Sequence, residues 1–268
     1  MRHLLISLCL LIGAAQSVSA QDTPLVTLET GADGRGWEGV GRLDIDGQGF
    51  CTAALIDVHL ILTAAHCIYD DAGRLIEAEQ FTFSAGLRNG RAEATRRIQS
   101  LTAHPDYVHD GPTALTNTVA NDIAVLRLDQ PIRRARVQPF PIADSPNVGD
   151  EIGVVSYGRG RAEVPSLQQV CSVRGEQAGV VIMNCDVDFG SSGAPVFMVK
   201  DGKTSIVSVI SAMTEWDSEK VSLGTSLGAP LRALLAHYNG AGPARPGGAQ
   251  RVITMGERND TGAKFVRP

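Results

Sequence analysis

Hydrophobic residues occur along this chain in short runs, and some runs alternate with polar residues at every second position. Phe81-Thr82-Phe83-Ser84 shows this alternation, which is typical of a strand with one buried face. Further strand-like runs lie at 50–56, 60–63, 96–103 and 123–128 in the first half of the chain, and at 151–157, 168–174, 179–186, 194–199, 204–213 and 221–227 in the second. Because these runs are short and are separated by turn residues, they predict an all-β fold.

The two groups of runs are separated by residues 129–149, which contain Pro131, Pro139, Pro141 and Pro146. Proline lacks a backbone N–H and fixes φ, so this stretch disfavours regular structure. We therefore predict one folded half over 37–135 and a second over 136–238. The second should end in a short helix over 230–238, where apolar side chains share one helical face: Leu231, Leu234, Leu235 and Tyr238.

The two ends of the chain differ from this strand-rich body. Residues 1–20 combine a basic start, an apolar run and the small residues Val18-Ser19-Ala20, which predicts a secretory signal peptide cleaved after Ala20. The alternative is an uncleaved membrane anchor, but the apolar run is short for a span of ~20 residues. We expect residues 21–36 to be irregular, and residues 239–268, rich in Gly, Arg and Pro, to form a disordered tail.

Composition narrows the classes of function. The chain has 268 residues, is 43% hydrophobic and carries a formal net charge of −5. It can therefore bury a substantial core, and it lacks the basic surplus that is typical of nucleic-acid-binding proteins. We expect a secreted or periplasmic monomer with no nucleic-acid partner and, after signal cleavage, no membrane partner.

Five cysteines become four if Cys9 leaves with the signal peptide. An even number in an exported chain indicates disulfides, and four cysteines allow three pairings. The pairing of sequence neighbours, Cys51–Cys67 and Cys171–Cys185, closes one loop in each half and is our prediction. Cysteine and histidine spacings typical of a zinc site are missing, so we expect no metal.

Three segments carry candidate chemistry. Leu62-Thr63-Ala64-Ala65-His66-Cys67 places a histidine beside a cysteine that can anchor its loop, and a proton-transferring base needs a fixed position. Asp122 directly precedes an apolar strand, where a buried carboxylate needs a partner such as imidazole. Taken singly, a structural histidine and a turn-capping aspartate are the plainer interpretations.

The third segment is Phe189-Gly190-Ser191-Ser192-Gly193-Ala194-Pro195-Val196. Its glycines permit a tight backbone that points successive N–H groups into one hollow, which can hold an oxyanion. A plain Gly/Ser turn is the alternative, since such turns are common in β proteins.

Thr63–Cys67, Asp122–Leu126 and Gly190–Pro195 resemble the His, Asp and Ser motifs of the trypsin/chymotrypsin family, in that family's chain order. The resemblance extends over about 41–238. It implies two six-stranded antiparallel Greek-key β-barrels with a short C-terminal helix, and a secreted serine endopeptidase that cleaves proteins or peptides without a cofactor.

The same resemblance implies a role for each matched residue. Ser192 is the nucleophile, His66 is the general base and then the general acid, and Asp122 orients His66. The backbone N–H groups of Gly190 and Ser192 form the oxyanion hole. His104, in a stretch similar to a surface segment of the family, is expected to be structural.

The sequence also departs from the family. Trypsin-like enzymes have Asp where Ser191 stands, and that Asp pairs with a newly cut amino terminus, for which no IVGG-like segment is present here. The chain is closer in style to bacterial secreted members, including V8-like glutamyl endopeptidases. A catalytically silent homologue that acts as a binding module is the alternative function, and an esterase using the same three residues is a weaker one.

The resemblance leaves substrate preference open. Asp186 lies six residues before Ser192, where trypsin has the pocket-base Asp that selects Arg or Lys, and Asp188 is a second carboxylate in reach. Ser211 and Met213 fall on the expected pocket wall. Met213 replaces a usual Gly and should narrow the pocket, while Ile210 stands where a Glu-specific enzyme would carry His.

Overall fold

A computed structural model describes residues 22–109, 116–216 and 218–240. The predicted signal peptide, residues 1–20, lies outside the described residues, as do residues 241–268 of the predicted tail. Asn239 and Gly240, which we assigned to that tail, are instead the last two residues of a helix.

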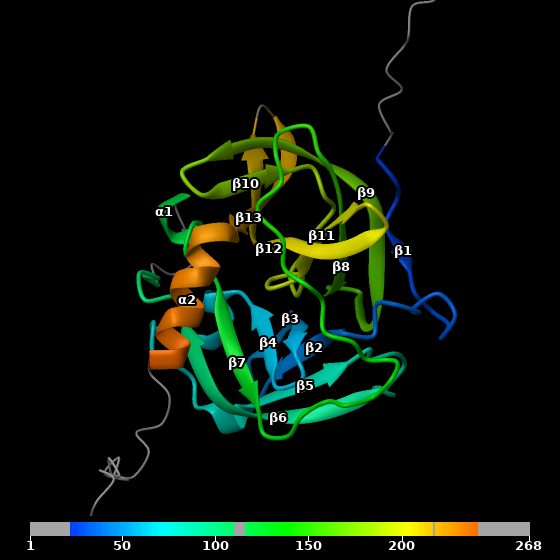
Figure 1. Cartoon of the computed structure of the whole chain (residues 1–268), viewed down its shortest axis with the longest axis vertical. Coiled ribbons are helices and arrows are strands. Elements are labelled where there is room, and N and C mark those ends of the chain that lie inside the picture. The colour runs from blue at the N-terminus through cyan, green and yellow to red at the C-terminus, as the bar shows by residue number, and fades with distance from the viewer. Residues whose placement is uncertain (1–21, 110–115, 217, 241–268) are drawn as a thin grey trace, which may run out of the picture.

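Six strands of the first half form a closed antiparallel barrel with the order β2-β3-β4-β7-β6-β5 (Figure 1). Their bounds are β2 Val40–Ile45, β3 Gly49–Asp57, β4 Leu60–Thr63, β5 Phe81–Ala85, β6 Ala94–Ala103 and β7 Ala124–Leu128. The alternation predicted for 81–84 is observed over its first three residues, because Phe81 and Phe83 are fully buried while Thr82 between them is partly exposed. Ser84, which should lie on the exposed face, is buried as well. The inward-facing aromatic rings therefore help to fill the first barrel.

The second half is a seven-stranded sheet with the order β1-β9-β10-β13-β12-β11-β8. Its strands are β1 Val26–Thr27, β8 Glu151–Gly158, β9 Arg161–Gln177, β10 Val180–Met183, β11 Pro195–Lys200, β12 Lys203–Trp216 and β13 Glu219–Ser226. The strand β8, at one end of this order, pairs with its neighbour β11 and also with β9 near the other end. The six strands from β9 to β8 in this order therefore close on themselves. The seventh strand, β1, lies in the segment predicted to be irregular and pairs with β9, so the expected six strands are supplemented by one.

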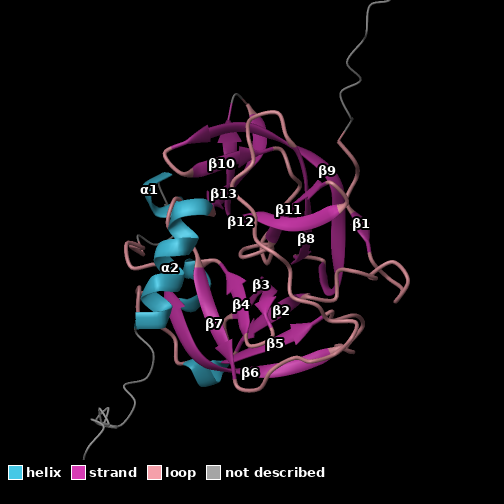
Figure 2. Ribbon diagram, in the orientation of Figure 1, coloured by secondary structure: helices cyan, strands magenta, loops and turns pink. Residues whose placement is uncertain are grey.

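The helices are short except for the last. They are the 3-10 helices η1 Ala65–Ile68 and η2 Ala78–Gln80, and the α-helices α1 Thr116–Val119 and α2 Gly228–Gly240 (Figure 2). Leu231 and Leu234 of α2 are buried, and α2 contacts β6 and β7 of the first half. The C-terminal helix, which belongs to the second half in sequence, thus packs against the first barrel. No helix in the described part of the chain is long and apolar enough to cross a membrane.

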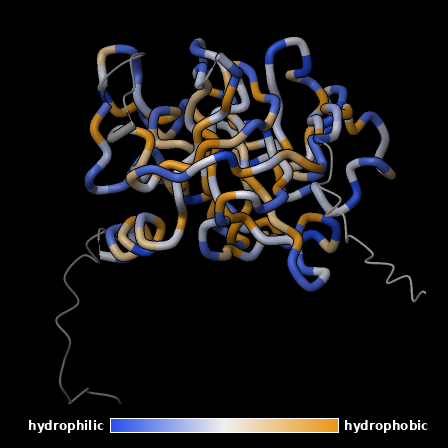
Figure 3. The backbone as a smooth tube through the Cα atoms, turned by 90° about the horizontal axis from the view of Figure 1, so that it is seen from above, coloured by the Kyte–Doolittle hydropathy of each residue, from blue (hydrophilic) through white to orange (hydrophobic). Residues whose placement is uncertain are grey.

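Hydrophobic packing joins the two halves. The larger core cluster fills the first barrel and also includes Val155, Phe197, Ile206 and Val209 from the second half. The Trp37 ring lies 4.8 Å from that of Phe197, measured between ring centroids. Figure 3 shows hydrophobic segments crossing the middle of the molecule, with hydrophilic segments in the outlying loops. The all-β, two-sheet arrangement with one C-terminal helix confirms the expected fold class.

Both predicted disulfides are present, and each closes a loop within one half. Cys51 on β3 is bonded to Cys67 in η1, across a sequence separation of 16, and Cys171 on β9 to Cys185, across a separation of 14. The first bond fixes the segment that carries His66 to the wall of the first barrel.

Replacing Cys51 and Cys67 together with alanine is expected to lower the free energy of unfolding by about 2–5 kcal/mol. The reason is that the loop they close gains conformational freedom mainly in the unfolded chain. Denaturant unfolding of the parent and the double variant measures the difference. An unchanged unfolding midpoint would contradict this prediction.

Candidate active site

His66 is held at the end of a buried strand. The strand β4 ends at Thr63, and η1 begins two residues later with no exposed surface at Ala64 or Ala65. Both side chains are small and fully buried, so the backbone can turn sharply before His66. The imidazole keeps 31% of its side-chain surface exposed and lines a cavity of about 730 Å³.

Asp122 fixes the orientation of this imidazole. It lies just before β7 and is 2% exposed. One carboxylate oxygen accepts the backbone N–H of His66 at 2.8 Å, and the other lies 2.7 Å from His66 Nδ1 and also accepts the hydroxyl of Ser211. A carboxylate facing Nδ1 favours the tautomer that carries its proton on Nδ1, so Nε2 is left as the basic atom.

The pair also sets the charge of both groups. Burial lowers the pKa of His66, but the negative charge of Asp122 and its hydrogen bond outweigh burial and raise the pKa above its ordinary value. Burial raises the pKa of Asp122, but the charge of His66 and hydrogen bonds from His66 and Ser211 hold it below its ordinary value. Asp122 is therefore ionised at neutral pH.

Ser192 lies in a loop clamped to β3. Thr52 N–H donates to the carbonyl of Ser192 at 2.8 Å, and the Thr52 hydroxyl donates to the carbonyl of Gly190 at 2.9 Å. Gly193 has a φ of 78°, and a Cβ there would lie 2.0 Å from Thr63 Oγ1. Glycine is therefore required at this position on two grounds, the left-handed backbone and the close approach to β3 and β4.

The loop leaves two backbone donors free. The N–H of Gly193 donates to the carbonyl of Ile210 at 2.7 Å. By contrast, the N–H groups of Gly190 and Ser192 have no protein acceptor among the described residues. Gly190 and Ser192 flank Ser191, so their two free N–H groups can both donate to a single anionic oxygen.

The three residues predicted to act together line one cavity, which also contains Ser211 and Met213. In the described part of the chain, no hydrogen bond joins the Ser192 hydroxyl to His66 Nε2. Such a bond is often long in an unliganded site and tightens when substrate binds. The arrangement provides a hydroxyl, an oriented base and anion-binding N–H groups around one space.

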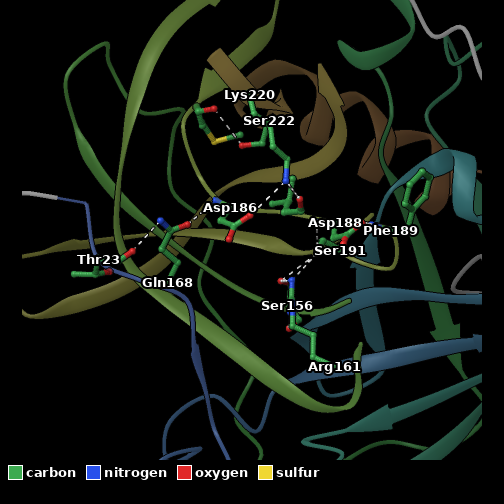
Figure 4. A network of polar contacts seen from close by, with 12 residues as sticks. Thr23, Ser156, Arg161, Gln168, Asp186, Asp188, Phe189, Ser191, Lys220 and Ser222 are labelled. Carbon is green, nitrogen blue, oxygen red and sulfur yellow. Dashed lines mark hydrogen bonds and ion pairs between the residues drawn. The ribbon is translucent and has the colours of Figure 1, made fainter. Parts of the chain in front are cut away.

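Asp186 does not share this space. Its side chain is 61% exposed, and its carboxylate lies 3.4 Å from the ammonium group of Lys220 (Figure 4). Lys220 also donates to the carbonyl of Val187 at 2.8 Å. Asp188, the second candidate carboxylate, does line the cavity, and its Oδ1 accepts the N–H of Phe189.

Other cavity residues were not found from the sequence. One is Phe189, which is 60% exposed and whose ring lies 4.3 Å from the guanidinium carbon of Arg159. Val187 is a further lining residue from the second half, and the others are aromatic or polar side chains from the first half, among them Tyr69, Asp71, Tyr107 and His109. They come from loops without periodicity, so no pattern marked them.

Two other arrangements of histidine and cysteine are outside the hydrogen-bonded pair of His66 and Asp122: His104 with its neighbour, and the group Cys51, His66 and Cys67. His104 is 4% exposed, and its Nδ1 accepts the N–H of Asp106 at 3.1 Å. Cys51, His66 and Cys67 place ligand-type atoms within 4.8 Å of one another, but the two sulfurs are bonded to each other. That trio therefore offers no thiolate to a metal.

Comparison with known proteins gives one family match. The model of the family described as trypsin matches residues 31–216, which include His66, Asp122 and Ser192. The chain is similar to vitamin K-dependent protein C of Oryctolagus cuniculus, with 36% identity over 81 residues, covering 30% of this chain and 16% of the relative.

Two more relatives show similar partial coverage. Mannan-binding lectin serine protease 1 of Homo sapiens is 27% identical over 126 residues, which cover 42% of this chain and 17% of the relative. Suppressor of tumorigenicity 14 protein homolog of Bos taurus is 32% identical over 136 residues, which cover 46% of this chain and 15% of the relative. The chain thus matches only about a sixth of the length of these relatives.

Proposed function

Because this chain belongs to the trypsin family of serine proteases, we propose that it is a secreted or periplasmic serine endopeptidase that cleaves proteins or peptides. Its nucleophile is Ser192, its base is His66 and its orienting carboxylate is Asp122. The observation that carries the proposal is the double hydrogen bond between Asp122 and His66 beside the cavity that Ser192 also lines.

The mechanism follows from these positions. Ser192 Oγ attacks the scissile carbonyl carbon while His66 Nε2 takes the hydroxyl proton, and the N–H groups of Gly190 and Ser192 stabilise the resulting oxyanion. His66 then returns the proton to the leaving amine, which leaves an acyl group on Ser192. Water, deprotonated by His66, releases that acyl group and restores the hydroxyl.

The pH dependence of kcat/KM should follow His66. Protonated imidazole cannot accept the Ser192 proton, and the pKa of His66 is raised above its ordinary value of about 6.5. We therefore expect kcat/KM to rise with pH through a midpoint above about 6.5. Initial rates on a reporter peptide from pH 5 to 9 test this, and a midpoint below about 6 would contradict it.

The same raised pKa affects stability with a definite sign. The charged His66–Asp122 pair contributes fully below the ordinary imidazole pKa, and that contribution is lost as pH rises through the folded-state pKa of His66. The lowered pKa of Asp122 acts at the other end, since its contribution is lost as pH falls through that folded-state value.

For substrate preference we propose an uncharged P1 residue of small to medium size. Asp186, at the offset where trypsin carries the Asp that selects Arg or Lys, is paired with Lys220 outside the cavity. The carboxylate of Asp188, which does line the cavity, accepts the N–H of Phe189. Met213, on the cavity wall, takes up space that a glycine would leave open.

Replacing Met213 with glycine should therefore raise the ratio of kcat/KM for a P1 Phe substrate over a P1 Ala substrate by at least about tenfold. The physical reason is that removing the thioether side chain enlarges the cavity where a large P1 side chain would lie. A ratio that does not change would contradict the assignment of Met213 to this wall.

Cleavage of a mixed peptide library tests the proposed function and its P1 preference together. Cuts made by the parent and lost in Ser192→Ala support the endopeptidase, and their P1 residues report the preference. An absence of cuts from the folded parent would favour the alternative, a catalytically silent homologue that acts as a binding module.

We also propose, as the sequence indicated, that the protein is closer to bacterial secreted members, V8-like ones among them, than to enzymes activated by a new amino terminus. Two observations support this. Ser191 replaces the aspartate that would pair with a new amino terminus. Val26–Thr27 of the N-terminal segment pair with β9, so this segment is part of the folded sheet. Amino-terminal sequencing of active material tests the idea, and a new terminus near Trp37 that coincides with the onset of activity would refute it.

A further inference from the structure

We infer that Arg161 is a positioning residue for the proposed peptidase: through Ser191 it holds the loop 188–193, and with it the two free N–H groups beside Ser192. This inference rests on the proposed function and adds a residue that none of the sequence motifs contains. Figure 4 shows Arg161, Ser156, Ser191 and Asp188 in one network of polar contacts.

Ser191 is the centre of this network. It is fully buried, and its hydroxyl oxygen lies 3.0 Å from Arg161 Nη2, which donates to it, and 3.3 Å from the donating N–H of Asp188. The hydroxyl proton can be donated to the carbonyl of Tyr157 at 3.1 Å. The Ser156 hydroxyl, 3.3 Å away, is a second possible acceptor of that proton. The two lone pairs accept from Arg161 and Asp188, so the hydroxyl has no unused bonding capacity.

Arg161 itself is held by a second serine. It is the first residue of β9, and Nη1 donates to the carbonyl of Ser156 while Nη2 donates to the Ser156 hydroxyl at 3.1 Å. A Cβ at Gly158 would lie 2.8 Å from the guanidinium carbon. A glycine beneath the guanidinium therefore lets it lie flat against the end of β8.

The guanidinium has no carboxylate within ion-pairing distance in the described part of the chain. Burial lowers its pKa, and the more distant Asp186 and Asp188 only partly offset this. A partly buried cation without a partner is costly unless its hydrogen bonds are satisfied. Its position is therefore fixed by serine oxygens, and one of the two serines lies directly beside the nucleophile.

The contact reaches the free N–H groups through the backbone of Ser191. Its N–H donates to the carbonyl of Asp188 at 2.9 Å, and its carbonyl accepts the N–H of Ala194 at 2.9 Å. Ser191 is thus bonded at three points, two in the backbone and one in the side chain. Because it lies between Gly190 and Ser192, a shift of Ser191 would change where both N–H groups point.

A second role for Arg161 would be to brace the turn between β8 and β9 without affecting catalysis. The two roles predict different kinetics. If Arg161 only stabilises the turn, replacing it lowers the melting temperature and leaves kcat of the folded enzyme unchanged. If Arg161 positions the loop, replacing it lowers kcat with little change in KM, because the two N–H groups contribute most when charge develops on the substrate oxygen.

The experiment compares Arg161→Met, Ser191→Ala and the double variant in steady-state cleavage of a reporter peptide. We expect each single variant to lose about 10²-fold in kcat, with KM within about threefold of the parent. The double variant should lose no more than either single variant, since both changes break the same contact.

Matched controls separate this effect from general damage. Arg96→Met removes an arginine that bonds backbone carbonyls of the first half, and Ser208→Ala removes a fully buried serine that donates to Thr225. Within the described ranges, no hydrogen bond joins either residue to the loop 188–193, so kcat should stay within about threefold in both.

Unchanged kcat in folded Ser191→Ala would overturn the inference, and so would losses that multiply in the double variant. If Arg161→Met does not fold, Arg161→Gln takes its place, because the shorter amide side chain also lacks the guanidinium that contacts the Ser191 hydroxyl. A folded parent that cleaves nothing would overturn the proposed function together with this inference. A parent that cleaves and variants that match it would overturn the inference only.

Discussion

Replacing Ser192 with alanine is expected to lower kcat by about 10⁶-fold while leaving the melting temperature unchanged. The variant lacks the attacking oxygen, so the acyl-enzyme cannot form and there is no hydroxyl proton for His66 to accept. The fold should persist, because Thr52 holds this segment through the backbone carbonyl of Ser192, which the substitution keeps.

Steady-state cleavage of a reporter peptide, with calorimetry on the same samples, measures both quantities for Ser192→Ala. Ser208→Ala is the matched control, since it removes a buried hydroxyl from β12. A Ser192→Ala enzyme that keeps more than about a tenth of the parental kcat would show that another group is the nucleophile.

Replacing Asp122 with asparagine is expected to lower kcat by roughly 10⁴-fold. Asparagine has nearly the same shape but offers only one acceptor oxygen, where the carboxylate now accepts bonds from His66 N–H, His66 Nδ1 and Ser211. An amide NH₂ that faces Nδ1 would force the proton onto Nε2. Nε2 could then no longer accept the proton of Ser192.

The loss in Asp122→Asn should be largest where His66 of the parent is neutral, so the comparison is made on the alkaline side of the pH profile. Asp129→Asn, an exposed change just past the other end of β7, serves as the control and should leave kcat unchanged. A loss below about tenfold in Asp122→Asn would show that the carboxylate does not set the tautomer of His66.

Strands with clear hydrophobic runs could be predicted from the sequence, and less regular ones could not. The runs at 81–84 and 123–128 correspond closely to β5 and β7. The strand β2, Val40–Ile45, was not singled out because Arg42 and Asp44 interrupt it. The first part of β9 was also missed, because Pro165 and the charged residues Arg161 and Glu163 obscure the strand pattern that pairs with β8.

Sequence motifs named the residues of the candidate site, but only the fold brings them together. His66 and Asp122 are 56 residues apart and meet because β4 and β7 are neighbours in the barrel. Counting from Ser192 suggested that Asp186 enters the pocket, but the segment after Cys185 runs so that Asp186 faces Lys220. Counting residues from Ser192 therefore places neighbours correctly within its own motif, but not across a loop whose path differs from that of trypsin.

Arg161 shows a different limit of sequence reasoning. It lies 30 residues before Ser191, in a charged turn that resembles an ordinary solvated hairpin. Its contact with Ser191 depends on how β8 and β9 fold back beside the nucleophile loop, and no spacing in the sequence encodes that approach.

The central claim is that His66 and Asp122 make Ser192 a nucleophile, and a fluorophosphonate probe tests it most directly. The Ser192 oxygen should displace fluoride and form a bond to phosphorus, which mass spectrometry locates after digestion. We predict one adduct on Ser192 in the parent and none in His66→Ala. A folded parent that stays unmodified, or that carries the adduct on another residue, would contradict the account.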